Sequence, residues 1–242
     1  MFDSKNLERY RRQFELIGER GQRSLHESRV FLAGAGGIGS PVALYLAAAG
    51  VGHIRIVDDD VVDLTNLNRQ ILHGEPDIGK LKVTSAAEKI NSINSGIDVD
   101  PRPVRIDAQN VWELIEGMDL IVDALDNYPA RYILNVASIK RKIPYFHGAV
   151  RGFSGQVTTI IPGDTPCLEC IFPQSPPEEN TPVMGTTAGI IGLIQANEVI
   201  KYLLGKGDLI TNRLLIWDGL SSELTSIPLE KYPGCRRCSN KE

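Results

Sequence analysis

The sequence has no long apolar run and no block of charge of one sign. None of its hydrophobic stretches approaches the roughly 20 residues that a membrane-spanning helix needs. Lys and Arg number 26 and Asp and Glu number 30, so the formal net charge is -4. Such a chain offers no basic surface to nucleic acid or anionic membranes. Because residues 1–12 are polar and charged, unlike a secretory signal, we expect a cytoplasmic protein that binds neither nucleic acid nor membrane.

Cysteine is also scarce, and all four cysteines fall into two C-x-x-C pairs. These pairs are Cys167 with Cys170 and Cys235 with Cys238. In a reducing compartment, this arrangement favours a metal site over disulfides. Four thiolates suit a closed tetrahedral zinc site, which would tie the end of the chain to its middle. Redox chemistry by one pair is the alternative, although neither pair lies beside a βαβ turn, where that motif normally works.

The first part of the chain alternates between strand and helix patterns. Strands are expected at residues 29–34, 53–57, 99–106 and 120–124. Helices are expected from Pro41 to Gly50 and at residues 84–93 and 128–141. Such alternation predicts a mostly parallel sheet that is covered on both faces.

The pattern changes after Pro144. The expected strands are residues 145–150, 156–161, 214–217 and 224–227, and their spacing indicates antiparallel pairing. A proline-rich loop at residues 173–182 precedes a predicted helix at residues 189–204. We therefore expect one α/β domain over residues 1–242, with a short helical segment at its N-terminus. Its Rossmann-like parallel half, residues 1–143, is extended by the antiparallel strands of residues 144–242 into one mixed sheet.

A glycine-rich turn lies between the first predicted strand and the first predicted helix. Its G-x-G-x-x-G motif consists of Gly34, Gly36, Gly37 and Gly39. Glycines in this setting permit a tight turn and a close approach of the backbone to phosphate at a helix N-terminus. Asp58 ends the second predicted strand, 19 residues after Gly39, near the spacing of about 20 that is typical of a carboxylate holding ribose hydroxyls. A purely structural turn is the alternative, but the added carboxylate favours a nucleotide site.

Polar residues downstream of Asp58 indicate which nucleotide binds. They are Asn66, Arg69 and Gln70, followed by Lys82. Arginine grips phosphate oxygens with a planar set of donors, and lysine adds a compact charge. These cations suit a triphosphate whose pyrophosphate must leave, whereas a dinucleotide needs no such set. The alternative is that Arg69 and Lys82 are solvated surface charges.

Asp126 follows the apolar strand at residues 120–124, at the end where open α/β sheets bind ligands. Mg²⁺ bound to phosphates typically takes one or two carboxylates, so Asp126 is the magnesium candidate. It could instead, or in addition, be the N-cap of the following helix. Asp123 alternates away from Asp126 and is expected to point elsewhere. His147 is expected to be a core histidine or one that supports the site from behind.

These motifs together resemble one family, the MoeB/ThiF-type sulfur-carrier adenylyltransferases, which are relatives of ubiquitin-activating enzymes. The resemblance runs from about Arg9 to Cys238. It rests on the segment 9–13 (RYRRQ), the glycine turn, the segment 66–70 (NLNRQ), Lys82, the segment 125–127 (LDN) and both cysteine pairs. It implies a homodimer with an eight-stranded mixed sheet in each subunit. The implied reaction is ATP-dependent adenylation of the Gly-Gly carboxylate of a small ubiquitin-like sulfur carrier, with release of pyrophosphate.

The resemblance also implies roles for individual residues. The four glycines, Gln70 and Asn127 would bind ATP, and Asp58 would hold its ribose. Asn66, Arg69 and Lys82 would hold the phosphates, and Asp126 the Mg²⁺. Arg12 would reach across the dimer into the partner's site, although a basic helix face is the alternative interpretation. The carrier's own carboxylate would attack the α-phosphorus, so no general base is expected.

The chain departs from the family pattern at one point. Members often carry a further cysteine in the loop after the first pair, but residues 174–184 contain none. We therefore expect the reaction to stop at the acyl-adenylate, with sulfur supplied by a separate donor and no appended sulfurtransferase domain. The pathway stays open between molybdopterin, thiamine and tRNA thiolation. A nicotinamide-dependent oxidoreductase and a non-catalytic protein of the same fold are the competing hypotheses.

Overall fold

The computed structural model describes residues 8–175 and 182–239, and within them eight strands form one mixed sheet. Its order is β3-β2-β1-β4-β5-β6-β7-β8. Pairing is parallel from β3 to β5 and antiparallel from β5 to β8. The strands are β1 (Arg29–Ala33), β2 (His53–Val57), β3 (Asp98–Arg102), β4 (Leu120–Asp123), β5 (Tyr145–Arg151), β6 (Ser154–Ile160), β7 (Arg213–Asp218) and β8 (Glu223–Pro228). The predicted fold class, a parallel half extended by antiparallel strands, is confirmed.

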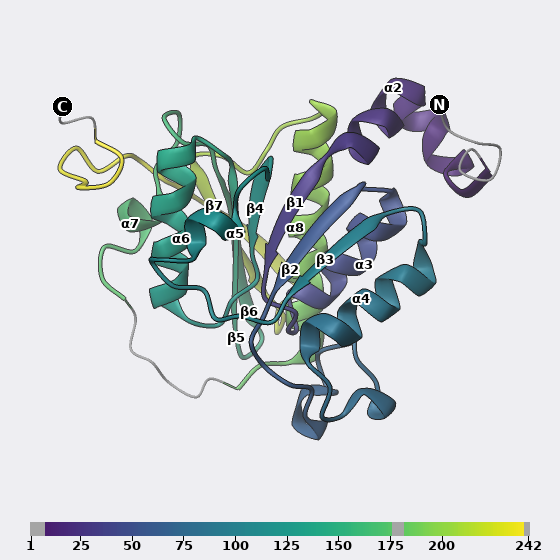
Figure 1. The fold of residues 1–242 in the computed structure, drawn as a ribbon. Coiled ribbons are helices and arrows are strands. Elements are labelled where there is room, and N and C mark those ends of the chain that lie inside the picture. Colours follow the sequence, from purple (N-terminus) through teal and green to yellow (C-terminus); the bar gives the residue numbers. More distant parts are fainter. Residues whose placement is uncertain (1–7, 176–181, 240–242) are drawn as a thin grey trace.

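Helices cover both faces of the parallel half (Figure 1). They are α2 (Arg11–Glu27), α3 (Gly39–Ala49), α4 (Lys82–Ile93), α5 (Val111–Leu114), α6 (Tyr128–Arg141), α7 (Leu168–Ile171) and α8 (Gly185–Leu204), with short 3-10 helices η1 (Leu64–Asn66) and η2 (Glu75–Asp77). Side chains alternate along a strand, so β1 buries Val30 and Leu32 with α3, α4 and α8. It buries Phe31 and Ala33 on the other face, with α5 and α6.

Some predicted boundaries were wrong. The strand expected at residues 99–106 ends at Arg102, because the next residue, Pro103, cannot donate a backbone hydrogen bond to a ladder. The helix expected at residues 189–204 begins four residues earlier, at Gly185. A side chain at Gly185 would place its Cβ 2.5 Å from the carbonyl oxygen of Asn68, so close packing, rather than a helix break, explains this glycine.

Some predicted segments extend beyond the described residues. Residues 1–7 of the N-terminal segment and residues 176–181 of the proline-rich loop lie outside the part of the chain that the structure describes. Within the described part, no helix has both the length and the apolar character that crossing a bilayer requires.

Candidate nucleotide site and cysteine cluster

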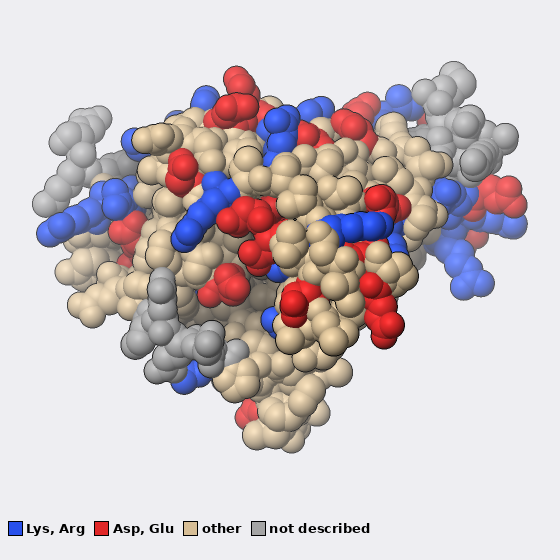
Figure 2. All heavy atoms as spheres, turned by 60° about the horizontal axis from the view of Figure 1, so that its bottom comes forward, with Lys and Arg blue, Asp and Glu red and all other residues tan. Residues whose placement is uncertain are grey.

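The glycine turn lies where the strand order of the sheet reverses. β1 pairs with β2 on one side and with β4 on the other, and the turn follows β1 directly. Open α/β sheets bind ligands in the crevice outside the strand ends at such a point. Figure 2 views this end of the molecule and shows a face that is hollowed at its centre, with acidic side chains gathered around the hollow.

The glycines of the turn permit backbone contacts that side chains would prevent. Gly34 has a φ of +97°, and a Cβ there would lie 2.7 Å from the carbonyl oxygen of Ala124. A Cβ at Gly39 would lie 2.0 Å from the carbonyl oxygen of Gly34. These two glycines therefore hold the turn against the end of β4, and so beside the segment that carries Asp126.

Gly36 differs from these two because the space beside it is open. A Cβ built on Gly36 would have a single described neighbour within 4 Å, the Nε2 atom of Gln70 at 3.8 Å. Gln70 is only 4% exposed, and its Oε1 has no hydrogen-bond partner among the described residues. An open backbone next to an unpaired buried acceptor fits a bound polar ligand better than a closed core.

Asp58 joins the end of β2 to the glycine turn. Its Oδ2 accepts a hydrogen bond of 2.8 Å from the amide of Ala35, and its Oδ1 accepts one of 3.0 Å from the amide of Asp60. Burial raises the pKa of Asp58, although the charge of Lys82 opposes the rise. The Lys82 side chain is 7% exposed, and its Nζ lies 2.8 Å from Oδ2 of Asp60. Lys82 is therefore a buried, paired cation at this site, so the alternative interpretation as a solvated surface charge is wrong for it.

The structure places Arg69 against the glycine turn, whereas the side chain of Asn66 bonds to its own local backbone. Asn66 Oδ1 accepts a 3.1 Å hydrogen bond from the amide of Asp63 in the cap of η1. Arg69 Nη1 donates to the carbonyl of Thr65 at 3.0 Å. A Cβ at Gly37 would lie 3.4 Å from Cγ of Arg69, so the stem of this arginine lines the turn.

Asp126 is exposed at the end of β4. The neighbouring residue, Asn127, caps α6, because its Oδ1 accepts a 3.1 Å hydrogen bond from the amide of Ala130. The alternative role of Asp126 as the N-cap is therefore wrong. Asn127 Nδ2 also lies 3.4 Å from Asp126 Oδ1. The Asp126 carboxylate remains accessible, and the donor type and the strand-end position both fit Mg²⁺.

Arg12 is not part of the site in its own chain. It is exposed in the first turn of α2, the helix at the upper right of Figure 1. Its neighbour Gln13 donates from Nε2 to the carbonyl of Ala49, at the far end of α3 from the glycine turn, at 2.7 Å. An 11-residue helix such as α3 is about 16 Å long, so Arg12 is remote from this site.

Two buried histidines support the site, and the sequence indicated only one of them. His147 is fully buried, as expected, with Nδ1 2.7 Å from Asp123 Oδ2. His73 was not predicted. Its Nε2 lies 2.9 Å from the carbonyl oxygen of Ala35 in the glycine turn, and its Nδ1 lies 2.9 Å from Ser85 Oγ. Burial lowers the pKa of both histidines. No local motif marks His73, because its partner is 38 residues away.

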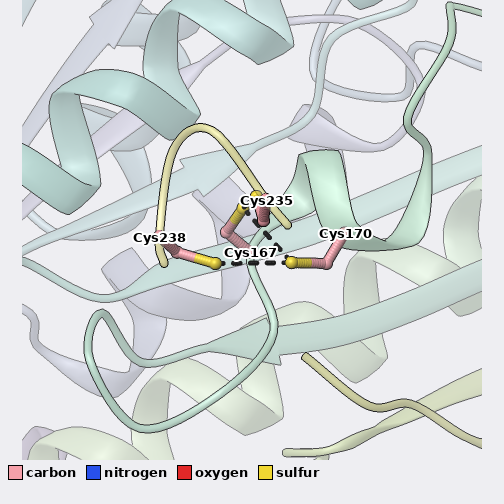
Figure 3. Close-up of side chains that lie close together, drawn as sticks. All are labelled: Cys167, Cys170, Cys235 and Cys238. Carbon is pink, nitrogen blue, oxygen red and sulfur yellow. Dashed lines mark hydrogen bonds between the residues drawn. The ribbon is translucent and has the colours of Figure 1, made fainter. Parts of the chain in front are cut away.

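The four cysteines converge from two distant segments (Figure 3). All four Sγ atoms lie within 4.8 Å of one another. The separations are 3.6 Å for Cys167 and Cys235, 3.3 Å for Cys170 and Cys238, and 3.9 Å for Cys167 and Cys170. A tetrahedral zinc with Zn–S bonds of about 2.3 Å spaces its sulfurs about 3.8 Å apart. The cluster therefore fits zinc held by four thiolates.

Helix α6 connects the cysteine cluster to the nucleotide site. Asn135 Oδ1 accepts a 3.0 Å hydrogen bond from the amide of Leu168, which lies between the cysteines of the first pair. The hydroxyl of Tyr132 donates to the carbonyl of Phe172 at 2.8 Å. The same helix begins next to Asp126. A metal that orders the first cysteine pair would therefore also support α6.

We expect Cys235→Ser to lower the zinc content from about one ion per chain to nearly none, because a closed structural site needs all four thiolates. The thermal midpoint should fall at the same time, since the tail is no longer tied to α7. Metal analysis after gel filtration measures the first effect and calorimetry the second. Ser239→Ala, which alters the same tail without removing a thiolate, is the control. A full zinc content in Cys235→Ser would contradict the assignment.

Comparisons with known proteins show which family this chain belongs to. The ThiF family matches residues 10–237. The chain is 41% identical to the SAMP-activating enzyme E1 of Haloferax volcanii, over 98% of this chain and 90% of that protein. It is 36% identical to the sulfur carrier protein adenylyltransferase of Thermus thermophilus, over 98% of this chain and 92% of that protein.

This chain matches only part of the length of one further relative, and it shares the fold of another protein at low sequence identity. The chain is 40% identical to the adenylyltransferase and sulfurtransferase MOCS3 of Culex quinquefasciatus, but spans only 56% of it. The fold also matches the crystal structure of E. coli MccB with ATP, with a TM-score of 0.85 at 24% identity, over 96% of this chain and 75% of that one. Because the family match covers nearly the whole chain, this protein belongs to the ThiF family.

Proposed function

We propose that this protein is an adenylyltransferase that transfers AMP from ATP to the C-terminal Gly-Gly carboxylate of a small ubiquitin-like sulfur carrier and releases pyrophosphate. The observation that carries the proposal is the position of the glycine turn, between Asp58 on one side and the Asp126 segment on the other. The Thermus relative, named a sulfur carrier protein adenylyltransferase, and the Haloferax relative, named a SAMP-activating enzyme E1, support the substrate class.

ATP would lie along the glycine turn at the N-terminus of α3, where free backbone amides favour phosphate. Gly36 leaves room for the nucleotide, and Gln70 Oε1 offers it an unpaired acceptor. Asp58 would hold the ribose. Its carboxylate accepts two backbone amides in the structure, and because a carboxylate has about four acceptor positions, it can also accept from ribose hydroxyls.

Asn66, Arg69 and Lys82 would hold the phosphates. The ammonium of Lys82 has three donors, so it can keep Asp60 as a partner while it contacts a phosphate oxygen. Asp126, with Asn127 beside it, would hold Mg²⁺, which supplies positive charge to the departing pyrophosphate. The carrier carboxylate is already ionised at neutral pH, so its oxygen attacks the α-phosphorus directly. The bond from the α-phosphorus to the bridging oxygen breaks, and the residues of the site position and neutralise charge.

We further propose a homodimer in which Arg12 of each subunit contacts the phosphates in the partner's site. The support is that Arg12 is exposed on α2 and remote from the site of its own chain. The same helix exposes Leu16, which is 77% accessible. An arginine supplied from outside the site stabilises charge that develops on phosphate oxygens.

The carrier is assigned to the half of the chain after residue 143, which also holds the zinc cluster. There β8 forms an edge of the sheet and is exposed along its whole length. Such an edge offers main-chain hydrogen bonds to an extended peptide. Because residues 174–184 contain no cysteine, we propose that the cytoplasmic reaction ends at the acyl-adenylate and that a separate donor supplies the sulfur. The pathway, whether for molybdopterin, thiamine or tRNA thiolation, depends on which carrier binds.

Exchange of labelled pyrophosphate into ATP tests the reaction. It should require a carrier ending in Gly-Gly and should stop when the two glycines are removed. Asp126→Ala should lower the rate at least 10²-fold, the order of magnitude for removing a group that stabilises the transition state, while the protein stays folded. Asp164→Ala, an exposed carboxylate elsewhere, is the control. Exchange without carrier dependence, or at the wild-type rate in Asp126→Ala, would refute the proposal. An oxidoreductase or a non-catalytic protein would give no exchange.

Mixed dimers test the role of Arg12. Arg12→Ala and Asp126→Ala should each be inactive alone, but dissociated and reassociated together they should recover about a quarter of the wild-type exchange rate. Half of the dimers would be mixed, and each would have one complete site, because a two-fold dimer repeats the same contact twice. If the mixture stays inactive while chromatography shows mixed dimers, Arg12 does not act on the partner.

A further inference from the structure

A fully buried ion pair lies behind the segment that carries Asp126. It joins Arg131 of α6 to Asp123, the last residue of β4, with a distance of 3.3 Å from Arg131 Nε to the carboxylate. The two side chains are 4% and 0% exposed. Neither residue belongs to the nucleotide-binding set proposed above. Such a pair needs an explanation, because apolar residues of similar volume are often at least as stabilising in a core.

Arg131 holds the backbone of the segment directly. Its Nη2 donates to the carbonyl of Leu125, the residue before Asp126, and also to the carbonyl of Gly148 in β5 at 3.1 Å. The amide of Leu125 donates to Asp123 Oδ1 at 3.1 Å. Both polar backbone atoms of Leu125 are therefore bonded to the ion pair. The main chain that leads into Asp126 is thereby fixed relative to β4 and β5.

Asp123 is in turn fixed by three further groups. Its Oδ2 accepts from the Tyr145 hydroxyl at 2.7 Å and lies 2.7 Å from His147 Nδ1. Gln195 Nε2 donates to its backbone carbonyl at 2.8 Å. Burial alone would raise the pKa of Asp123, but Arg131 and His147 outweigh it and hold this pKa below its usual range. The carboxylate is therefore ionised, and Gln195 of α8 holds the backbone of the same residue.

We propose that Arg131 and Asp123 are positioning residues that fix residues 124–127 and thereby aim the Asp126 carboxylate at the magnesium of the phosphates. The inference rests on the proposed function. The proposed role requires arginine at position 131. The planar guanidinium bonds to one carboxylate and two carbonyls at once, and a lysine ammonium cannot reproduce this geometry. Arg131→Lys would retain the positive charge but would not hold the Leu125 backbone in place.

The test is a double-mutant cycle between Arg131→Lys and Asp126→Asn, read out by carrier-dependent pyrophosphate exchange at several Mg²⁺ concentrations. Arg131→Lys should slow exchange by up to about 100-fold, because a displacement of about 1 Å at a reacting centre can cost that much. It should also raise the Mg²⁺ concentration needed for half-maximal rate. In the Asp126→Asn background the same substitution should have little further effect, because it acts through the carboxylate.

Arg55→Lys is the matched control. Arg55 also pairs with a carboxylate, Asp100, at 2.7 Å and donates to the carbonyl of Leu114 at 2.7 Å, but it lies outside the site. Its replacement should leave the Mg²⁺ dependence unchanged. If Arg131→Lys does not fold, Tyr145→Phe, which removes a single hydrogen bond to Asp123, should raise the Mg²⁺ requirement several-fold with Asp126 present and not in Asp126→Asn.

Three outcomes would overturn the inference. Additive losses in the cycle, or an unchanged Mg²⁺ requirement in Arg131→Lys, mean that the pair contributes only to stability. When Arg131→Lys is unstable, an unchanged requirement in Tyr145→Phe has the same meaning. The failure of the proposed function is distinguishable, because Asp126→Asn alone would then exchange at the wild-type rate, or no carrier would support exchange at all.

Discussion

The glycine turn and the end of β4 are in direct backbone contact, and the arrangement of the site depends on that contact. A side chain at Gly34 or Gly39 would overlap a carbonyl oxygen, so glycine is required where the two segments meet. The contact places the turn, with the open space at Gly36, beside the strand end that carries Asp126. Asp58 completes the arrangement from β2 through its hydrogen bond to Ala35. The C-terminal ends of the neighbouring parallel strands β2, β1 and β4 thus lie together at the site.

Helix α6 is hydrogen-bonded both near the nucleotide site and near the cysteine cluster. Asn127 caps its first turn, Arg131 bonds to the segment before it, and Asn135 accepts a hydrogen bond from Leu168, which lies between the cysteines of the first pair. A single 14-residue helix therefore bonds both to the residue before Asp126 and to the segment that carries the first cysteine pair. The cysteine cluster and the Asp126 segment are thus linked through the same helix.

Much of the fold could be predicted because its signals are local. The alternation of strands and helices, the glycine turn and the cysteine pairs depend on spacings within a few residues, and the structure agrees with them. Contacts between distant residues left no such signal. His73 bonds to Ala35, Lys82 pairs with Asp60, and Arg131 reaches Gly148. Each pairing depends on which strands become neighbours, so it emerges only after the sheet has formed. The alternative role of Asp126 as the helix cap was wrong by one residue, because Asp and Asn are both good caps and Asn127 takes that position.

The central claim is that the space beside Gly36 holds the nucleoside triphosphate. Calorimetric titration of ATP with Mg²⁺ into Gly36→Val tests it most directly. Nothing described except the Gln70 amide lies within 4 Å of a Cβ at this position, so the variant should fold and unfold as the wild type does. The account predicts that ATP binding is lost in Gly36→Val and kept in the wild type. Equal ATP affinity in the two proteins would contradict it.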